Sequence, residues 1–185
     1  MQLELFFGKM VEGYLLKVTQ VNYNKKFLNI VKDILENEEF NKLKSIKHHD
    51  TNRYDHSLRV SYYSYLITKD LGLNYKSVAR AALLHDFFLE ENYKEKISKR
   101  LDTLLKHPKF ALETASKYYD LSDLEKDIIV SHMYPVTLNP PKYLESWIVD
   151  FVDDVVALYE KYDSFVFKLS TIKNFLFLVL LKGLN

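Results

Sequence analysis

The sequence predicts an all-α protein that folds as a single compact helical bundle, and its few helix breakers and its apolar spacing carry this prediction. Only four glycines and four prolines occur in 185 residues, whereas strand-rich domains need many turn residues. Apolar side chains recur at steps of three and four over several long segments, a spacing that places them on one face of a helix. We therefore expect helices joined by short connections around one core.

One domain accounts for the whole chain. Its length suits one well-packed core, and its apolar fraction of 48% and charged fraction of 28% are those of an ordinary globule. No repeat, linker or low-complexity segment divides it. We expect residues 1–185 to form one domain with a core at about 47–160 and with N- and C-terminal helices packed on that core.

The charge balance and the lack of cysteine narrow the functional classes. A net charge of +1 gives no field that would gather a polyanion, so duplex nucleic acid is not an expected partner. Without cysteine the chain has no disulfide framework and no thiolate metal site, which leaves histidine and carboxylates as the strong metal ligands.

No segment of the sequence is expected to span a membrane. The N-terminus carries Glu4 in its apolar stretch and has no basic leader, so we expect no secretory signal and a cytoplasmic location. Near the C-terminus, Lys173 and Lys182 bracket the apolar run Phe175–Leu181 too closely for a membrane span. A buried terminal helix is favoured there over a membrane-surface anchor.

The first half of the chain contains three expected helices. One lies at about Asn24 to Ile46, interrupted in its middle, and the next at about His56 to Asp70, where the first residue shares a face with apolar side chains. A turn at Gly72 follows. Asn74 is a suitable N-cap for a third helix, which carries His85 on its apolar face.

Two further histidines are expected at a helix end and on a helix face. Pro108 suits the first position of the next helix, which would put His107 at its N-cap. Ser122 and Glu125 form a capping box for a helix that carries His132 on its apolar face.

The last predicted helix, at about Tyr143 to Tyr162, follows a loop that contains three prolines. Asp153 borders the apolar stripe of this helix, whereas Asp150 and Asp154 lie on an adjoining face. Asp153 is therefore the expected inward carboxylate.

Four inward histidines together favour a metal site, although each alone would be an ordinary core residue. Burying four imidazoles without partners costs on the order of several kcal/mol, and a shared ion removes that cost. Asp86, which directly follows His85, adds a carboxylate to this set. Such nitrogen and oxygen donors suit divalent transition metals: iron or manganese is favoured, and zinc, cobalt, nickel or magnesium would also be accepted. These histidines are His56, His85, His107 and His132.

Two segments resemble the first two motifs of the HD phosphohydrolase superfamily. They are residues 54–60, Tyr-Asp-His-Ser-Leu-Arg-Val, and residues 82–86, Ala-Leu-Leu-His-Asp. Asp153 matches the final metal-binding aspartate of that family. The resemblance covers about Lys47 to Glu160, and it implies an HD-type helical bundle with metal-dependent phosphohydrolase activity.

The histidines in His107-Pro108 and in the segment that ends at His132 resemble the extra histidines of the two-metal branch of this superfamily. The resemblance implies a dinuclear centre with two ions. Asp86 would bridge both ions and act in catalysis, and His107 and His132 would bind the second ion. The first ion would be held by His56, His85 and Asp153.

The resemblance also implies a reaction class, in which metal-activated hydroxide attacks the phosphorus of a phosphoester or phosphodiester. A small phosphorylated substrate, favoured to be a nucleotide, is the expected partner. Cyclic-dinucleotide phosphodiesterases of the family commonly continue with Ile-Gly-Lys after the His-Asp pair, whereas this chain has Phe87-Phe88-Leu89. It also lacks their Gly-Tyr-Pro signature, which argues against cyclic dinucleotides.

Basic residues near the metal ligands in sequence are candidates for binding the substrate phosphate. Arg53 is the best of them and is expected to act in catalysis as well, and His49 and Lys106 are the others.

Three other functions stay open at this point. The first is a mononuclear HD nucleotidase that acts on nucleoside monophosphates, with His107 and His132 near the site but not bound to metal. The second is a non-catalytic, metal-bearing module that senses a nucleotide. The third, a helical adaptor with an aromatic interaction surface, is disfavoured because aromatic side chains at helical spacing usually belong to the core. The oligomeric state is left open.

Overall fold

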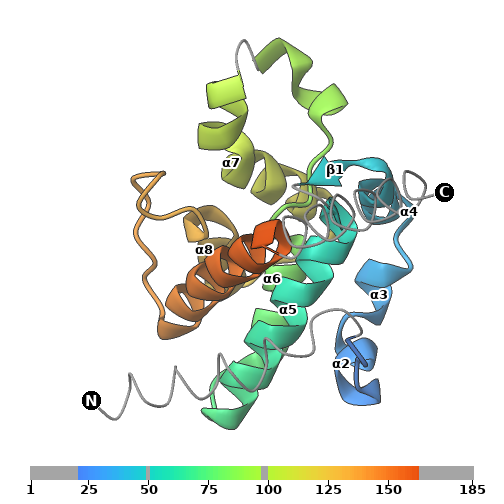
Figure 1. The fold of residues 1–185 in the computed structure, drawn as a ribbon, viewed down its shortest axis with the longest axis vertical. Helices are drawn as coiled ribbons and strands as arrows, with labels where there is room; N and C mark the ends of the chain where they lie inside the picture. Colours follow the sequence, from blue (N-terminus) through green and yellow to red (C-terminus); the bar gives the residue numbers. More distant parts are fainter. Residues whose placement is uncertain (1–20, 49–50, 97–99, 163–185) are drawn as a thin grey trace, which may run out of the picture.

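The computed structural model describes residues 21–48, 51–96 and 100–162, and helices form almost all of the regular structure in these ranges. Figure 1 shows the helices gathered around α5 (Arg53–Asp70) and α6 (Tyr75–Leu84). The strands seen in the described ranges are β1 (Lys47–His48) and β2 (Thr51–Asn52), an antiparallel pair with Lys47 opposite Asn52. The all-α prediction is confirmed.

The segment predicted as one interrupted helix is broken more often than expected. It contains α2 (Lys25–Ile30), α3 (Lys32–Leu35), α4 (Glu38–Asn41) and the 3-10 turn η1 (Lys42–Ser45). The side chain of Asn37 accepts hydrogen bonds from the main-chain N–H groups of Glu39 and Phe40. Because asparagine binds nearby main-chain groups so readily, it starts a new helix here instead of continuing the old one.

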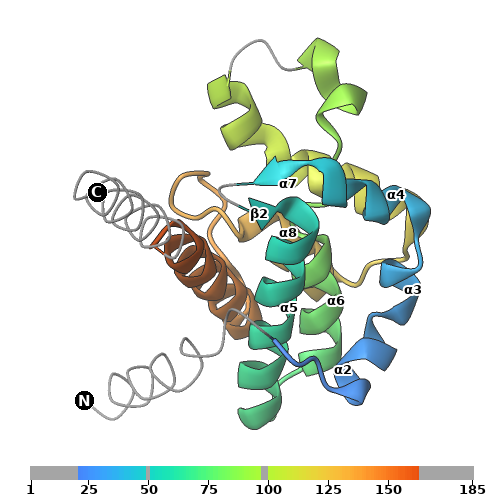
Figure 2. The ribbon, with the colours of Figure 1, turned by 45° about the vertical axis from the view of Figure 1, so that its right-hand side comes forward.

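The helices α5 and α6 lie side by side at the centre of the bundle (Figure 2). Asn52 caps α5 by accepting a hydrogen bond from the N–H of Asp55 (2.8 Å), so this helix begins three residues before the predicted start at His56. Small buried side chains allow close approach of the two helices, and the hydroxyl of Ser61 donates to the carbonyl of Ala79 at 2.6 Å.

The turn between α5 and α6 is the predicted one. Gly72 has a φ of +69°, a left-handed conformation that residues with a Cβ seldom adopt. The side chain of Asn74 then accepts a hydrogen bond from the N–H of Ser77 and caps α6, whose C-cap is His85.

The second half of the described chain supplies a short 3-10 segment and three helices. These are η2 (Glu90–Lys96), α7 (Arg100–Tyr118), α8 (Asp123–Ser131) and a helix over 144–162, called helix 144–162 below. The capping box of Ser122 and Glu125 is present as predicted. Helix 144–162, orange to red in Figure 1, crosses α5 and agrees with the predicted last helix.

The prediction for Pro108 was wrong, because this proline lies inside α7 and His107 is a mid-helix residue instead of an N-cap. A proline cannot donate to the carbonyl four residues earlier, which is that of Leu104. The imidazole of His107 supplies the missing donor: its Nδ1 lies 3.0 Å from that oxygen and 3.2 Å from the carbonyl oxygen of Thr103. The helix therefore continues through the proline.

Aromatic side chains fill much of the core, as their helical spacing in the sequence predicts. Five of them are less than 2% exposed, namely Phe27, Phe40, Tyr65, Phe87 and Phe88. No helix in the part of the chain that the structure describes is long and apolar enough to cross a membrane. The apolar run Phe175–Leu181 lies outside the described residues, and its burial in a terminal helix stays a prediction.

Candidate metal centre

Six side chains from five helical segments meet in the interior, and they are the six predicted metal ligands. The histidines at 85 and 132 are the C-caps of α6 and α8, so each ring stands where its helix ends. All six residues are at most 8% exposed. They are His56 on α5, His85 and Asp86 at the end of α6, His107 on α7, His132 at the end of α8 and Asp153 on helix 144–162.

The first group of donor atoms comes from His56, His85 and Asp153. The Nε2 atom of His56 lies 2.8 Å from Oδ1 of Asp153, and the Nε2 atom of His85 lies 3.5 Å from the same oxygen. One donor atom from each residue falls within 4.8 Å of the other two. This spacing is compatible with binding of one ion between them.

The second group comes from Asp86, His107 and His132. Their nearest contact joins the two Nε2 atoms of His107 and His132 at 3.0 Å, and Oδ1 of Asp86 lies 3.4 Å from the former and 3.9 Å from the latter. The other oxygen of Asp86 lies 3.9 Å from Nε2 of His85. The carboxylate of Asp86 therefore stands between the two groups.

Hydrogen bonds fix the orientation of all four imidazoles. Each Nδ1 atom faces an oxygen at 2.7–3.0 Å. A carbonyl oxygen only accepts, so an Nδ1 that faces one carries the hydrogen, and the Nε2 atom of the neutral ring keeps its lone pair. The oxygens are the main-chain carbonyls of Ala82 for His85, Leu104 for His107 and Ile129 for His132, and the carboxylate of Glu160 for His56.

This arrangement fits a divalent metal. The Nε2 atoms of His107 and His132 approach to 3.0 Å with both lone pairs directed inward, a contact that a shared cation makes favourable. The buried Nε2 atom of His85 has no hydrogen-bond partner among the described residues, and a buried polar atom without a partner is costly. Imidazole nitrogens and carboxylate oxygens are ordinary ligands of iron, manganese and zinc.

Charges within the centre shift the pKa values of its members in opposite directions. Burial alone would lower the pKa of His56, but hydrogen bonds to Asp153 and Glu160 raise it to about 10. Burial together with the nearby His85 and His107 lowers the pKa of His132 to about 3. Burial opposes ionisation of Asp153, yet His85 and His56 hold its pKa below the ordinary value. A metal ion bound by His56 would therefore have to displace a proton from that ring.

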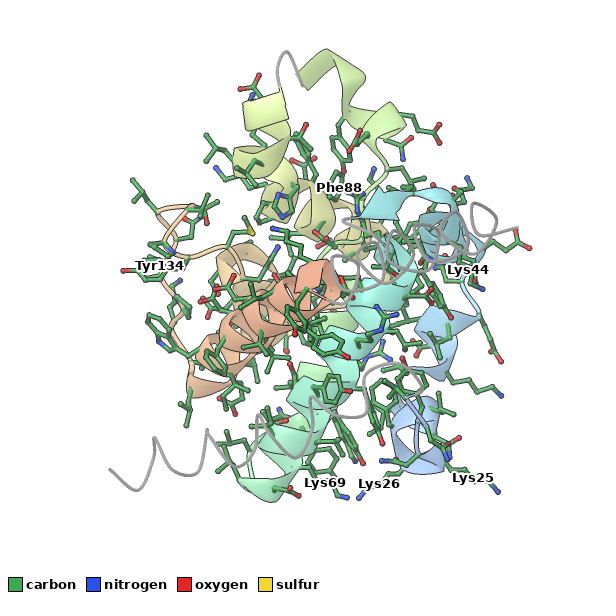
Figure 3. All side chains as sticks on the ribbon, viewed as in Figure 1. Lys25, Lys26, Lys44, Lys69, Phe88 and Tyr134 are labelled. Carbon is green, nitrogen blue, oxygen red and sulfur yellow. The ribbon has the colours of Figure 1, made fainter. Side chains whose placement is uncertain are left out.

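Arg53, which the sequence analysis predicts to bind phosphate, lies beside the centre. It is buried, its Nη1 donates to the carbonyl of Phe88 at 2.7 Å, and its guanidinium stacks on the Phe88 ring at 4.0 Å. The ring of Phe88, which is labelled in Figure 3, contacts both the guanidinium of Arg53 and the ring of His107. The Nε atom of Arg53 is 3.9 Å from Oδ2 of Asp86, and Nη2 is 3.6 Å from Oε1 of the exposed Glu90.

Of the other two predicted phosphate-binding residues, only Lys106 lies in the described ranges. Lys106 is 47% exposed and its ammonium lies 3.9 Å from Asp102, one turn earlier on α7. His49 lies outside the described residues. Their contact with substrate stays a prediction.

Sequence reasoning missed Glu160, which accepts from Nδ1 of His56, and Arg59, which binds Glu160. A signal was present, because Glu160 follows Asp153 by seven residues, which is about two helical turns and therefore the same face. Similarly, Arg59 follows His56 by three residues on α5.

A third buried carboxylate on helix 144–162, that of Asp150, makes a different contact. Its Oδ1 accepts a hydrogen bond from the main-chain N–H of Tyr134, labelled in Figure 3, at 3.2 Å. Burial and the negative charge of Asp154 raise the pKa of Asp150 from 3.8 to about 7. The folded protein therefore binds this proton more tightly than the unfolded chain does.

Asp150→Asn should consequently stabilise the metal-free protein at alkaline pH. The stability that protonated Asp150 contributes is fully present below its unfolded pKa and is lost as pH rises through about 7. Asparagine is neutral at every pH and keeps the acceptor for Tyr134. In thermal unfolding we expect the variant and the wild type to melt together near pH 4 and the variant to melt a few degrees higher at pH 8. A difference that does not change with pH would contradict this account.

Comparison with protein-family models matches residues 53–158 to the HD domain, a range that lies inside the core predicted from the sequence. No curated protein and no solved structure matched the chain in the corresponding comparisons. The matched range covers more than half of the chain and contains all six residues of the centre. The chain therefore belongs to the HD-domain superfamily of metal-dependent phosphohydrolases.

Proposed function

We propose that this protein is an active phosphohydrolase that cleaves a phosphoester or phosphodiester of a nucleotide at a dinuclear metal centre. The observation that carries the proposal is the position of Asp86 between two groups of donors. His56, His85 and Asp153 lie on one side, and His107 and His132 lie on the other.

Two divalent ions held by these groups would lower the pKa of a water molecule and neutralise charge that develops on phosphate. Iron or manganese is favoured, with zinc, cobalt, nickel or magnesium as alternatives. The protein contributes preorganisation, because the carbonyl and carboxylate partners of the Nδ1 atoms hold each ring with Nε2 inward. The rings need little rearrangement to bind.

Arg53 is proposed to bind the substrate phosphate. Its Nη1 is committed to the carbonyl of Phe88, whereas Nε donates no hydrogen bond within the described ranges and lies on the side of Asp86. A guanidinium can present Nε and one Nη together to two oxygens of a phosphate. Stacking on Phe88 holds the plane of the group in place.

Metal analysis joined to a substrate screen tests the proposal. We expect about two equivalents of transition metal per chain after reconstitution with iron, manganese or zinc, and hydrolysis of at least one class among nucleoside phosphates and phosphodiesters. Treatment with a chelator should abolish turnover, and adding the metal back should restore it. Less than about half an equivalent after reconstitution would contradict the metal centre, and full loading without turnover on any substrate would favour the nucleotide-sensing alternative.

A further inference from the structure

One of the four inward histidines differs from the others in the group that orients it. His85, His107 and His132 donate from Nδ1 to neutral main-chain carbonyls, whereas His56 faces the carboxylate of Glu160, with Nδ1 and Oε2 3.0 Å apart. Glu160 is only 7% exposed. A buried carboxylate is costly unless it is paired, so the contacts that hold it are informative.

Both oxygens of Glu160 are engaged by residues of α5. Oε2 faces His56, and Oε1 accepts from Nη1 of Arg59, one turn farther along the same helix. The ion pair with Arg59 therefore fixes the carboxylate of Glu160 in position against His56.

Helix 144–162 binds the imidazole of His56 at both of its nitrogens. Asp153 lies 2.8 Å from Nε2, and Glu160, seven residues later on the same helix face, lies 3.0 Å from Nδ1. The ring thus has one oxygen contact in the direction of the centre and one on the opposite side. A carboxylate on Nδ1 makes an imidazole a stronger electron donor at Nε2 than a carbonyl does.

We propose that Glu160 is a positioning residue that acts through His56 and makes the ion held by His56, His85 and Asp153 bind more tightly than the ion held by His107 and His132. The inference rests on the proposed dinuclear function and adds an order of loading to it. The first group fills first because one of its histidines is supported by a charged group, whereas the rings of the second group face neutral carbonyls. Glu160 lies beyond the range 53–158 that matches the HD domain.

The test is Glu160→Gln, which keeps the size of the side chain and an oxygen acceptor for Nδ1 but removes the charge. Stepwise metal affinities are measured by competition with a chromophoric chelator. We expect the tighter of the two metal affinities to fall about 10- to 100-fold and the weaker one to stay within about twofold. Loss of the hydrogen-bond partner of a ligating histidine weakens binding of the ion that this histidine holds by about that factor.

The matched control is Glu145→Gln, the same substitution on the same helix. Glu145 accepts from the main-chain N–H of Asn74 at 3.3 Å, at the solvent-exposed start of α6. Both affinities of this variant should equal those of the wild type. Circular dichroism of the metal-free proteins checks that all three chains are folded alike.

A second readout separates positioning from mere support of the fold. In the Co²⁺-loaded protein, each ligating imidazole N–H gives its own exchangeable, paramagnetically shifted proton resonance. Glu160→Gln should move the resonance of the His56 Nδ1–H, assigned by its loss in His56→Ala, and leave the other imidazole resonances in place. A purely structural role would move none of them or all of them.

The outcomes distinguish the inference from the function on which it rests. A wild-type protein that binds no metal overturns the proposed function, and this is seen before any variant is made. If the wild type binds two ions and Glu160→Gln keeps both affinities and the His56 resonance, only the role of Glu160 is overturned. An equal fall in both affinities also overturns it, because the effect would then not pass through His56.

Discussion

Asp86→Ala should abolish hydrolysis and remove the stabilisation that metal gives to the fold. The carboxylate of Asp86 approaches imidazoles of both groups, so its loss would take a ligand from each of the two proposed ions at once. Loss of a residue that hydrogen-bonds to a metal ligand typically lowers activity about 10- to 100-fold. Loss of the shared ligand itself should lower activity more than ~100-fold. Metal at a concentration of 100 times Kd should stabilise the folded wild type by roughly 3 kcal/mol. This stabilisation should raise the melting temperature of the wild type but not that of the variant.

The control for this experiment is Asp154→Ala. Asp154 is exposed and directly follows the inward Asp153, so it tests the loss of a carboxylate near the centre without loss of a ligand. Its activity and its response to metal should match those of the wild type. His85→Ala should behave as Asp86→Ala does, and full activity in either of these two variants would refute the site.

His107→Ala and His132→Ala should each lower bound metal from about two equivalents toward one and reduce activity by orders of magnitude. These two residues decide between the dinuclear phosphohydrolase and the mononuclear nucleotidase, because in the second case they lie near the ion without binding it. Their Nε2 atoms, 3.0 Å apart and next to Asp86, favour the first. His56→Ala should instead weaken binding of the ion that His56, His85 and Asp153 are proposed to hold.

Crystallography of the reconstituted protein supplies the direct measurement. An anomalous-scattering map should show two peaks, one of them within ligand distance of the Nε2 atoms of His107 and His132. A single ion farther than about 4 Å from both residues would defeat the dinuclear proposal and support the nucleotidase. Of the two variants His132→Ala is the cleaner, because His107 also supports α7 through the carbonyl of Leu104.

The inward positions of four predicted ligands could be found from the sequence because each lies at an expected point of helical periodicity. These are His56, His85, His132 and Asp153. Asn74 and the Ser122–Glu125 box start the helices that end at His85 and His132, and both caps are present. The capping rules succeeded at these two helices because each cap hydrogen bond joins residues only three positions apart in the chain.

Interactions between distant residues were not accessible in the same way. The pairing of Glu160 with His56 joins residues 104 positions apart and exists only because helix 144–162 crosses α5. Lys106 was selected for its nearness in sequence to His107, but consecutive helical side chains diverge by about 100°, and Lys106 is exposed beside Asp102. The N-cap prediction for His107 failed because the rule for proline ignores donors that come from side chains.

The pairing of His107 with Pro108 also restricts which residues can replace each of them over generations of mutation. Among side chains that bind divalent metals, aspartate and glutamate could replace the ligand but could not donate to the carbonyl of Leu104, which Pro108 leaves without its helical partner. A change of Pro108 to alanine would restore a main-chain donor and release position 107 from that second task. The order of mutations therefore matters: the proline must be lost before the histidine can be exchanged for an acidic ligand.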